Sequence, residues 1–333
     1  MGFAKYDAAK VQKVLEAVDA NERKMYYADM GVTLENVTSL KSALRLSGLD
    51  YTVEKRPLQF LAEKEQEWNG SLVRMTAPFP IIDQYATVRT DTMGFMGIVG
   101  KNYEILQNQE AFDFLDSMVL NGAKFETAGS FGTNGAKNFI TMSTEPMKIL
   151  DDDFLPTMMF LNSHDGSKAI QVMYVNVRIF CSNCIARARK GAENRINIRH
   201  SRSMNSKLDA ARYVLLEQTH YLEALKKEAE KLATTPFTKA AFESLARELF
   251  PVNETDSELV QIRNLAQVEQ LLKAYNQDDL ANFHNTAWGA IQAVADFESH
   301  PINFRKTKTS GSFTNVAINA MPLLNMVWER VAA

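Results

Sequence analysis

The sequence has little cysteine, no long apolar run and a net charge close to zero. Its 333 residues include two cysteines, Cys181 and Cys184, which lie too close together in the chain to staple a fold, so a reduced setting is expected. No stretch approaches the roughly 18 consecutive apolar residues of a membrane span. The first residues lack the apolar segment and cleavage site of a secretory signal. We therefore expect a cytoplasmic protein that does not enter a membrane.

The common nucleotide-binding and hydrolase motifs are also missing. There is no Walker sequence, no G-x-G-x-x-G and no G-x-S-x-G, so neither a phosphate-binding loop nor a serine nucleophile is supported. Carboxylates that could hold the two metal ions of a nuclease are scattered, at Asp83, Asp91, Glu104 and residues 151–153. We expect no cofactor and no enzymatic activity, with a metal-dependent nuclease as an alternative.

What is present is an ordinary globular composition, with 46% hydrophobic and 23% charged residues. The first two-thirds shows the period of two typical of strands. Residues 49–61 predict a half-buried strand, and residues 85–100 and 156–180 predict hairpins, the second with Asp165-Gly166 in its turn. Between them, residues 108–122 predict one helix, which Asn108 could cap.

After about residue 182 the apolar period becomes that of helices. Helices are expected at residues 206–233, 238–250, 255–275, 285–297 and 315–331. The third would open with a capping box, Thr255 to Glu258, and the last would kink at Pro322.

The predicted fold class is α+β, with an antiparallel sheet in the N-terminal two-thirds, helices packed on it and a helical C-terminal third. Three segments are expected: an N-terminal helical extension (1–38), a β-rich domain with a basic junction (39–205), and a helical region packed on the same core (206–333).

Cys181 and Cys184 have the spacing of half a zinc site, with His164 and His200 as conceivable partners. A second pair of ligands at close spacing is missing, so two small buried residues at a junction are the favoured interpretation. His164-Asp165 could be read as a catalytic dyad, but neighbours in sequence seldom point at each other. A tight turn explains both residues better. We expect neither a metal site nor catalytic residues.

Residues 185–212 differ sharply from the rest of the chain. They hold eight Arg or Lys against two acids, a local charge of +6 in a chain whose formal charge is −3, so the remainder carries −9. A solvated helix surface is the usual fate of such a run. Here the charges are predominantly of one sign, and arginine, which binds phosphate oxygens in a bidentate manner, outnumbers lysine. Salt bridges between subunits are the other alternative.

We therefore predict that this stretch contacts nucleic acid. Tyr174 and Phe180 could offer faces for base stacking, although core packing explains them equally well, and residues 305–308 could extend the patch. The predicted contacts are Arg178, Arg187, Arg189, Lys190, Arg195, Arg199, His200, Arg202 and Lys207.

Several segments together resemble the phage and plasmid-like proteins of the "domain of unknown function 932" family, from about residue 39 onwards. The resemblance rests on a Gly-x-x-Gly-x-x-Tyr-x-x-x-Gln-Asn pattern (Gly97, Gly100, Tyr103, Gln107 and Asn108), on the His-Asp-Gly-Ser turn, and on LRLSGLDYTVEKRPL, NIRHS and NTAWGAIQAVADFESH. It implies a mobile element in a bacterial host cell. The family pattern tends to read Cys-x-Asn-Thr where this chain ends in Cys184, which weakens the zinc interpretation further.

By analogy of architecture, the chain is similar to phage single-strand annealing proteins, which combine a small antiparallel sheet, helices and a basic groove. The resulting hypothesis is an ATP-independent protein that binds single-stranded DNA, forms homo-oligomeric rings or filaments, and assists annealing or recombination. The rival hypothesis is a mobile-element interaction protein that inhibits a host defence or regulatory factor through an acidic partner surface.

Overall fold

The computed structural model describes residues 27, 30–150, 152–178, 184–185, 195–202, 204, 218–301, 313–319 and 321–332, a few of them by backbone alone. The strands are β1 Val32–Thr33, β2 Val53–Trp68, β3 Ser71–Arg89, β4 Gly94–Gly100, β5 Lys124–Phe131, β6 Lys137–Ser143, β7 Met147–Ile149, β8 Asp152–Ser163, β9 Ile170–Arg178, β10 Cys184–Ile185 and β11 Arg195–Ile198. The helices are α2 Leu40–Leu46, α3 Asn108–Phe112, α4 Leu115–Leu120, α6 Gln218–Thr234, α7 Lys239–Leu249, α8 Glu258–Tyr275, α9 Ala287–Ser299 and α11 Pro322–Val331, with short turns η2 Thr133–Gly135, η3 Asp278–Phe283 and η4 Thr314–Ile318.

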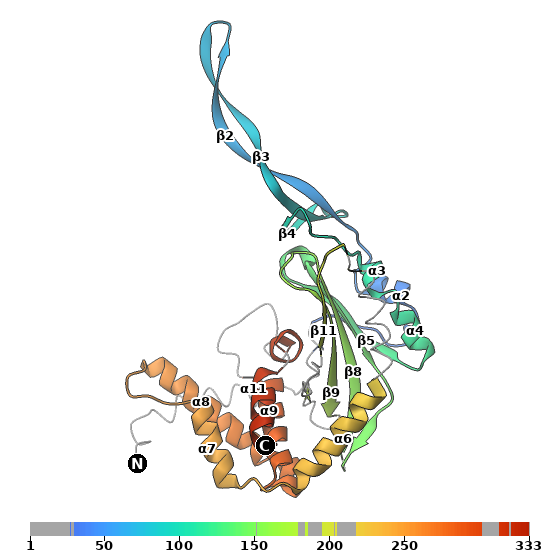
Figure 1. Cartoon of the computed structure of the whole chain (residues 1–333), viewed down its shortest axis with the longest axis vertical. Helices are drawn as coiled ribbons and strands as arrows, with labels where there is room; N and C mark the ends of the chain where they lie inside the picture. Colours follow the sequence, from blue (N-terminus) through green and yellow to red (C-terminus); the bar gives the residue numbers. More distant parts are fainter. Residues whose placement is uncertain are drawn as a thin grey trace.

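A large antiparallel sheet forms the centre of the molecule (Figure 1). Its strand order is β1-β5-β6-β8-β9-β10, with β7 paired to β8 and β11 paired to β9. Neighbouring residues on the central strands point to opposite faces, and both faces are covered. Phe139 packs in the core shared with the C-terminal helices, and Ile140 packs in the core shared with α2, α3 and α4. The predicted α+β class with an antiparallel sheet is confirmed.

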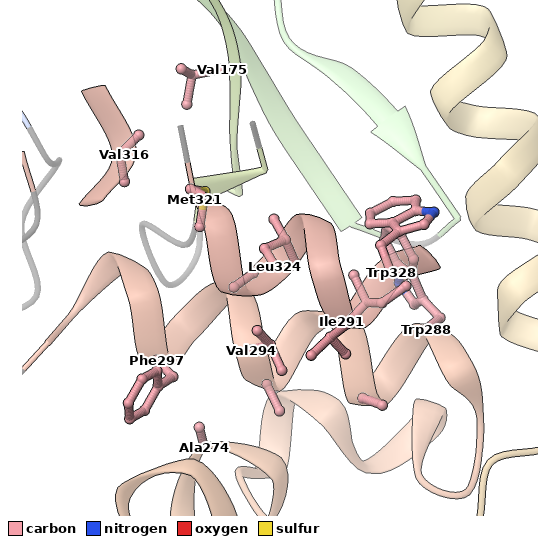
Figure 2. Packing of buried hydrophobic residues seen from close by; sticks show 14 of the residues in the cluster. Val175, Ala274, Trp288, Ile291, Val294, Phe297, Val316, Met321, Leu324 and Trp328 are labelled. Carbon is pink, nitrogen blue, oxygen red and sulfur yellow. The ribbon is translucent and has the colours of Figure 1, made fainter. Parts of the chain in front are cut away.

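Helix α9 is the central element of the helical third. All of its residues are buried, and it packs against α6, α8 and α11. Figure 2 shows Trp288, Ile291 and Val294 of α9 facing Leu324 and Trp328 of α11, and Val175 of the sheet belongs to the same cluster. The two indole rings meet edge to face, with centroids 6.0 Å apart. Such contacts join the helices to one face of the sheet.

The predicted turns are confirmed where local chemistry decides them. The hairpin β3–β4 turns between Arg89 and Gly94, and the hairpin β8–β9 turns through Asp165-Gly166, where Gly166 has a φ of 73°. The predicted single helix at 108–122 is wrong, because α3 ends at Phe112 and α4 begins at Leu115.

Three helix ends also differ from the sequence prediction. Gln107, and not Asn108, caps α3. The capping box from Thr255 is not formed, since α8 begins at Glu258 after Ser257. Pro322 does not kink a continuous helix: Met321 has a φ of 51°, and α11 starts afresh with Pro322 in its first turn. In the part of the chain that the structure describes, no helix has the length and apolar character needed to cross a membrane.

A second, three-stranded sheet carries the most unexpected feature. Strands β2 and β3, of 16 and 19 residues, form a hairpin that projects far from the main body (Figure 1). Strand β4 pairs with β3 only as far as Gln84, at the base. The predicted half-buried strand at 49–61 is therefore only the start of a much longer strand, most of which is exposed.

Candidate functional site

A buried polar cluster lies where the hairpin β8–β9, helix α3 and strand β6 meet. The side-chain oxygen of Asn108 accepts hydrogen bonds from Asn138 (2.8 Å) and Asn162 (3.2 Å) and lies 2.9 Å from Nε2 of His164. The amide nitrogen of Asn108 donates to the Leu49 carbonyl at 2.9 Å. All four side chains are buried, so the cluster fixes α3 against the sheet through hydrogen bonds between buried polar groups.

The residues that carry the family resemblance converge on this cluster. A side chain at Gly97 would lie 2.7 Å from Asp165, so glycine is required for the close approach of β4 to the β8–β9 turn. The Tyr103 hydroxyl donates to the Ser163 carbonyl at 2.7 Å, and its ring stacks on His200. Gln107 bonds both backbone groups of Val53, at 2.9 and 2.8 Å. These pattern positions therefore hold the turn, α3 and the base of the long hairpin together.

Three titratable side chains lie in or beside the cluster: His164 and His200, whose imidazoles are neutral, and Asp165, whose carboxyl group is ionised. Burial, with a smaller effect of nearby His200, lowers the pKa of His164 to about 3. Burial also lowers the pKa of His200 to about 4, although its contact with the Glu104 carbonyl opposes this. Burial alone would raise the pKa of Asp165, but hydrogen bonds from Ser167, Lys137 and Ser163 outweigh it and bring that pKa to about 2.

This geometry does not form a catalytic dyad. His164 Nε2 faces Asn108, whereas Asp165 bonds Ser163 at 2.7 Å and Ser167 at 2.6 Å and pairs with Lys137 at 2.9 Å. Nδ1 of His164 and Nε2 of His200 are buried without a hydrogen-bond partner among the described residues. As a neutral, buried pair, the two imidazoles are not suited to bind phosphate.

The register of β9 bears on the zinc alternative. Cys184 pairs with Val177 and Ile198 pairs with Ile170, so seven residues of β9, about 23 Å, separate the backbone of Cys184 from the residues that precede His200. Cys181 lies outside the described residues. Among the described residues, no three His, Cys, Asp or Glu side chains are grouped to hold a metal ion.

The basic stretch is attached to the edge of the large sheet. Strands β10 and β11 both pair antiparallel with β9. Ile185 lies opposite Asn176 and Arg195 lies opposite Met173, so the two pairings are three residues of β9, or about 10 Å, apart. This part of the stretch was expected to follow a helical period, and its ends are strands instead.

The structure places some of the predicted contacts and not others. Arg199 and Arg202 are exposed just beyond β11, and Arg202 lies 3.9 Å from Glu104. Arg178 is the last residue of β9, and Arg195 lies opposite Met173 near the middle of that strand; both are described by their backbone. Arg187, Arg189, Lys190 and Lys207 lie outside the described residues, as do residues 305–308 and Phe180.

One predicted contact, His200, and one candidate for base stacking, Tyr174, occupy interior positions. His200 is 8% exposed and stacks on Tyr103. Its ring therefore supports the packing at this end of the sheet and is not an exposed group that could contact nucleic acid. Tyr174 is also 8% exposed and belongs to the core shared with α2 to α4.

Sequence reasoning missed one cation at this end of the sheet. Lys168 is exposed in the β8–β9 turn. Because Ile198 lies opposite Ile170, the next residue of the chain, Arg199, approaches that turn. A lone lysine in a turn gives no signal in the sequence, and only the pairing of β11 with β9 brings it to the basic stretch.

A family model described as "Domain of unknown function (DUF932)" matches residues 95–319, more than half of the chain. The matched range holds the polar cluster from Gly97 to His200 and the basic stretch, and it leaves out the long hairpin β2–β3. No curated protein and no solved structure matches the chain.

Proposed function

We propose that this chain binds single-stranded DNA along the β9 edge of its large sheet. The chain belongs to the family described as "Domain of unknown function (DUF932)". The observation that carries the proposal is the attachment of the basic stretch to this edge. A charge of +6 lies within residues 185–212 of a chain whose net charge is −3. Strands β10 and β11 hold two points of that stretch on one strand.

Arginine side chains on such an edge would hold the phosphates. Arg199 and Arg202 are exposed where β11 ends, and Lys168 lies in the adjacent turn. Arg202 makes a long contact with Glu104, and an exposed pair of this kind contributes little stabilisation, so a phosphate can compete for the guanidinium. The acidic remainder of the molecule would repel DNA from other surfaces.

In this proposal the bases stay exposed, so that a complementary strand can pair with them. Binding would be independent of sequence, because phosphate contacts carry no sequence information. Annealing or recombination without ATP, in a mobile element, is the role we propose for such binding. It draws support from the resemblance to phage and plasmid-like proteins and from the lack of a nucleotide-binding motif in the sequence.

In this proposal the polar cluster supports the β9 edge and does not itself contact DNA. Tyr103 stacks on His200, and the His200 ring also contacts the Glu104 carbonyl at 3.2 Å. These contacts fix the segment that carries Arg199 and Arg202 against the β8–β9 turn. Because His164 and His200 are neutral at physiological pH, they hold this segment without adding charge.

The test compares two double variants by fluorescence anisotropy with a labelled single-stranded oligonucleotide. Arg199→Ala/Arg202→Ala removes two cations at the end of β11. Lys41→Ala/Arg45→Ala removes two exposed cations from α2, which contacts β5 on the other side of the sheet. We expect the first variant to weaken binding at least tenfold and the second to change it less than threefold. Equal effects of the two variants, or no binding by the native protein at low salt, would contradict the proposal.

The rival interpretation, an inhibitory interaction protein, predicts a different pattern. An acidic protein surface would then occupy the basic edge, and oligonucleotide binding would be weak and easily displaced by unlabelled polyanions such as heparin. Retention of one host protein by the native chain, lost in Arg199→Ala/Arg202→Ala and kept in Lys41→Ala/Arg45→Ala, would favour this rival.

A further inference from the structure

The long hairpin carries an exposed apolar surface that no described residue covers. We call residues 58–82 the arm. Trp68 is 66% exposed, and Phe60, Val73 and Met75 are also exposed. An isolated two-stranded hairpin is only marginally stable in water. Beyond its base, the arm lacks a third strand among the described residues, so it needs another surface to bury these side chains.

The register divides the arm into two different faces, because paired residues of an antiparallel ribbon point to the same side. One face holds five pairs: Phe60 with Phe79, Ala62 with Ala77, Lys64 with Met75, Gln66 with Val73, and Trp68 with Ser71. We call it the apolar face. The rings of Phe60 and Phe79 stack at 5.6 Å on it. Seven of its ten side chains are apolar.

The opposite face is polar and acidic. It carries Glu63, Glu65 and Glu67 along β2 and a single cation, Arg74, which pairs with Glu65 at 3.1 Å. Leu61 and Leu72 are exposed on this face as well, each beside a glutamate. Three carboxylates against one guanidinium would repel both nucleic acid and an anionic lipid surface. The arm is therefore suited to contact protein.

The edge of the arm is less suited to binding than its face. Pro78 and Pro80 lie two residues apart on β3. A proline has no N–H to give to a partner strand, so both occupy positions whose N–H would point away from β2. This outer edge therefore lacks two donors that an added strand would need. On the β3 side, the face and not the edge is therefore the surface suited to docking.

We propose that the apolar face of the arm binds the same face of a second copy of this chain, with the two arms antiparallel. In that arrangement a two-fold axis passes through the Lys64–Met75 pair. The larger Gln66–Val73 pair then lies over the small Ala62–Ala77 pair, and the Trp68–Ser71 pair at the tip lies over Phe60–Phe79 at the base. Gln66 then meets Ala62, Val73 meets Ala77 and Phe79 meets Ser71, a larger side chain over a smaller one in each case, while Trp68 meets Phe60 as an aromatic pair. The face is therefore complementary to itself, as an isologous interface requires.

The antiparallel arrangement also keeps the two main bodies apart, because each body lies at the far end of its partner's arm. Two parallel arms would bring the bodies to the same end. From Phe60 to Trp68 the face is about 27 Å long and about 10 Å wide. Two such faces come to roughly 540 Å² before the relief of the side chains is counted, which is the range of weak, transient interfaces. We therefore expect a dimer that dissociates at micromolar concentrations.

Lys64 is the charged residue of this face, and because it sits beside the axis it lies opposite the partner's Lys64. Its neighbours along β2 are Glu63 and Glu65, whose carboxylates lie on the polar face. A lysine can lay its apolar stem on the interface and bring its ammonium group to the ribbon edge near these acids. The dimer is independent of the proposed function, since the arm and the β9 edge belong to different sheets.

The test uses sedimentation velocity on the full chain and two variants that differ by one position. Val73→Glu puts a charge on the apolar face, and Leu72→Glu makes a comparable apolar-to-acid change on the polar face. We expect Val73→Glu to raise the dimer dissociation constant at least tenfold, which is about 1.4 kcal/mol, and Leu72→Glu to raise it less than threefold. A native chain that is monomeric throughout the micromolar range, or equal effects of both variants, would overturn the proposal.

Cross-linking gives a second readout that does not depend on a loss of stability. In a chain with Cys181→Ser and Cys184→Ser, Met75→Cys lies next to its own copy across the two-fold axis, whereas Thr76→Cys points away. A short bis-maleimide should join two chains efficiently at position 75 and poorly at position 76. Equal yields, or binding of the monomer to zwitterionic lipid vesicles that Val73→Glu abolishes, would reject the pairing of arms.

Discussion

Asn108 links more structural elements than any other side chain of the polar cluster. It bonds Leu49 from the loop before β2, Asn138 of β6 and Asn162 of β8, and it contacts His164. These partners are 30 to 59 residues away in sequence. A spacing rule therefore could not reveal the role of Asn108, and sequence analysis took it for a helix cap. The sequence pattern that contains Asn108 could be recognised, but the contacts that explain the pattern could not.

Removing this amide should leave several buried groups without partners. We expect Asn108→Ala to lower the free energy of unfolding by about 3 kcal/mol, because an unsatisfied buried polar group costs about 1–3 kcal/mol. The control, Asn121→Ala, removes an exposed amide that bonds only the Ser117 carbonyl, and should cost less than about 1 kcal/mol. Urea unfolding at neutral pH measures both, and similar losses would contradict the role assigned to Asn108.

Protonation of the two buried histidines should destabilise the fold. The pKa values of His164 and His200 are about 3 and about 4 when folded, below the unfolded value of about 6.5. The unfolded chain therefore binds protons first, and stability that is present above pH 6.5 is lost as the pH falls. Each histidine should cost about 2 kcal/mol between pH 7 and pH 5. A loss that is unchanged in His200→Gln would contradict this.

Glu298 should act in the opposite direction. It lies in α9 and accepts hydrogen bonds from the backbone N–H groups of Leu323 and Leu324 at the start of α11. Burial outweighs these bonds and raises the pKa of Glu298 to about 7. The folded chain then holds this proton more tightly than the unfolded chain, so stability is highest below about pH 4.5 and falls as the pH rises through 7.

Comparison with Glu298→Gln isolates this effect. Between about pH 5 and pH 8, the native protein should lose about 2–3 kcal/mol relative to the variant, which has no titrating group at this position. Chemical unfolding of both proteins across that range gives the difference directly. A difference that stays constant with pH would show that the carboxyl titrates as an ordinary exposed glutamate.

At the scale of elements, sequence patterns succeeded where local chemistry decides the outcome. The β8–β9 hairpin and its Asp165-Gly166 turn were predicted because both residues suit a tight turn. Sequence analysis missed the arm because its strands have no core to face, and because exposed apolar residues are only a weak indication of a strand. Strands β10 and β11 were missed because they have two and four residues and depend on pairing with β9.

Strand β4 offers a matched pair of glycines from the same pattern. A side chain at Gly97 would meet Asp165 at 2.7 Å, whereas one at Gly100 would meet nothing within 4 Å. We expect Gly97→Ala to lower the free energy of unfolding by about 2 kcal/mol through forced movement of the β8–β9 turn. Gly100→Ala should change it by less than about 0.5 kcal/mol. If thermal unfolding ranks the two variants equally, the close approach of β4 to the turn is not a constraint.

At the scale of the whole molecule, the basic stretch and the apolar face of the arm lie in different places. The basic stretch is attached to the β9 edge, and the arm carries its apolar face away from the body (Figure 1). The sequence alone revealed the basic stretch, because a local charge of +6 stands out in a chain with a net charge of −3. The attachment of that stretch to a sheet edge required the register of β10 and β11.

The two proposals can fail separately. A chain with Val73→Glu should bind a short oligonucleotide as the native chain does, because the arm and the β9 edge belong to different sheets. A chain with Arg199→Ala/Arg202→Ala should dimerise as the native chain does. Anisotropy and sedimentation velocity on both variants measure this. Loss of both properties in either variant would show that DNA binding and self-association use one surface.

The salt dependence of DNA binding tests the central claim most directly. If about six phosphates are neutralised, the logarithm of the association constant should fall with the logarithm of salt concentration at a slope near −4 for single strands. Removing three cations with Arg187→Ala/Arg189→Ala/Lys190→Ala should reduce the slope by about 2. A slope near zero in the native protein, or one that the triple variant leaves unchanged, would show that the basic stretch does not hold DNA.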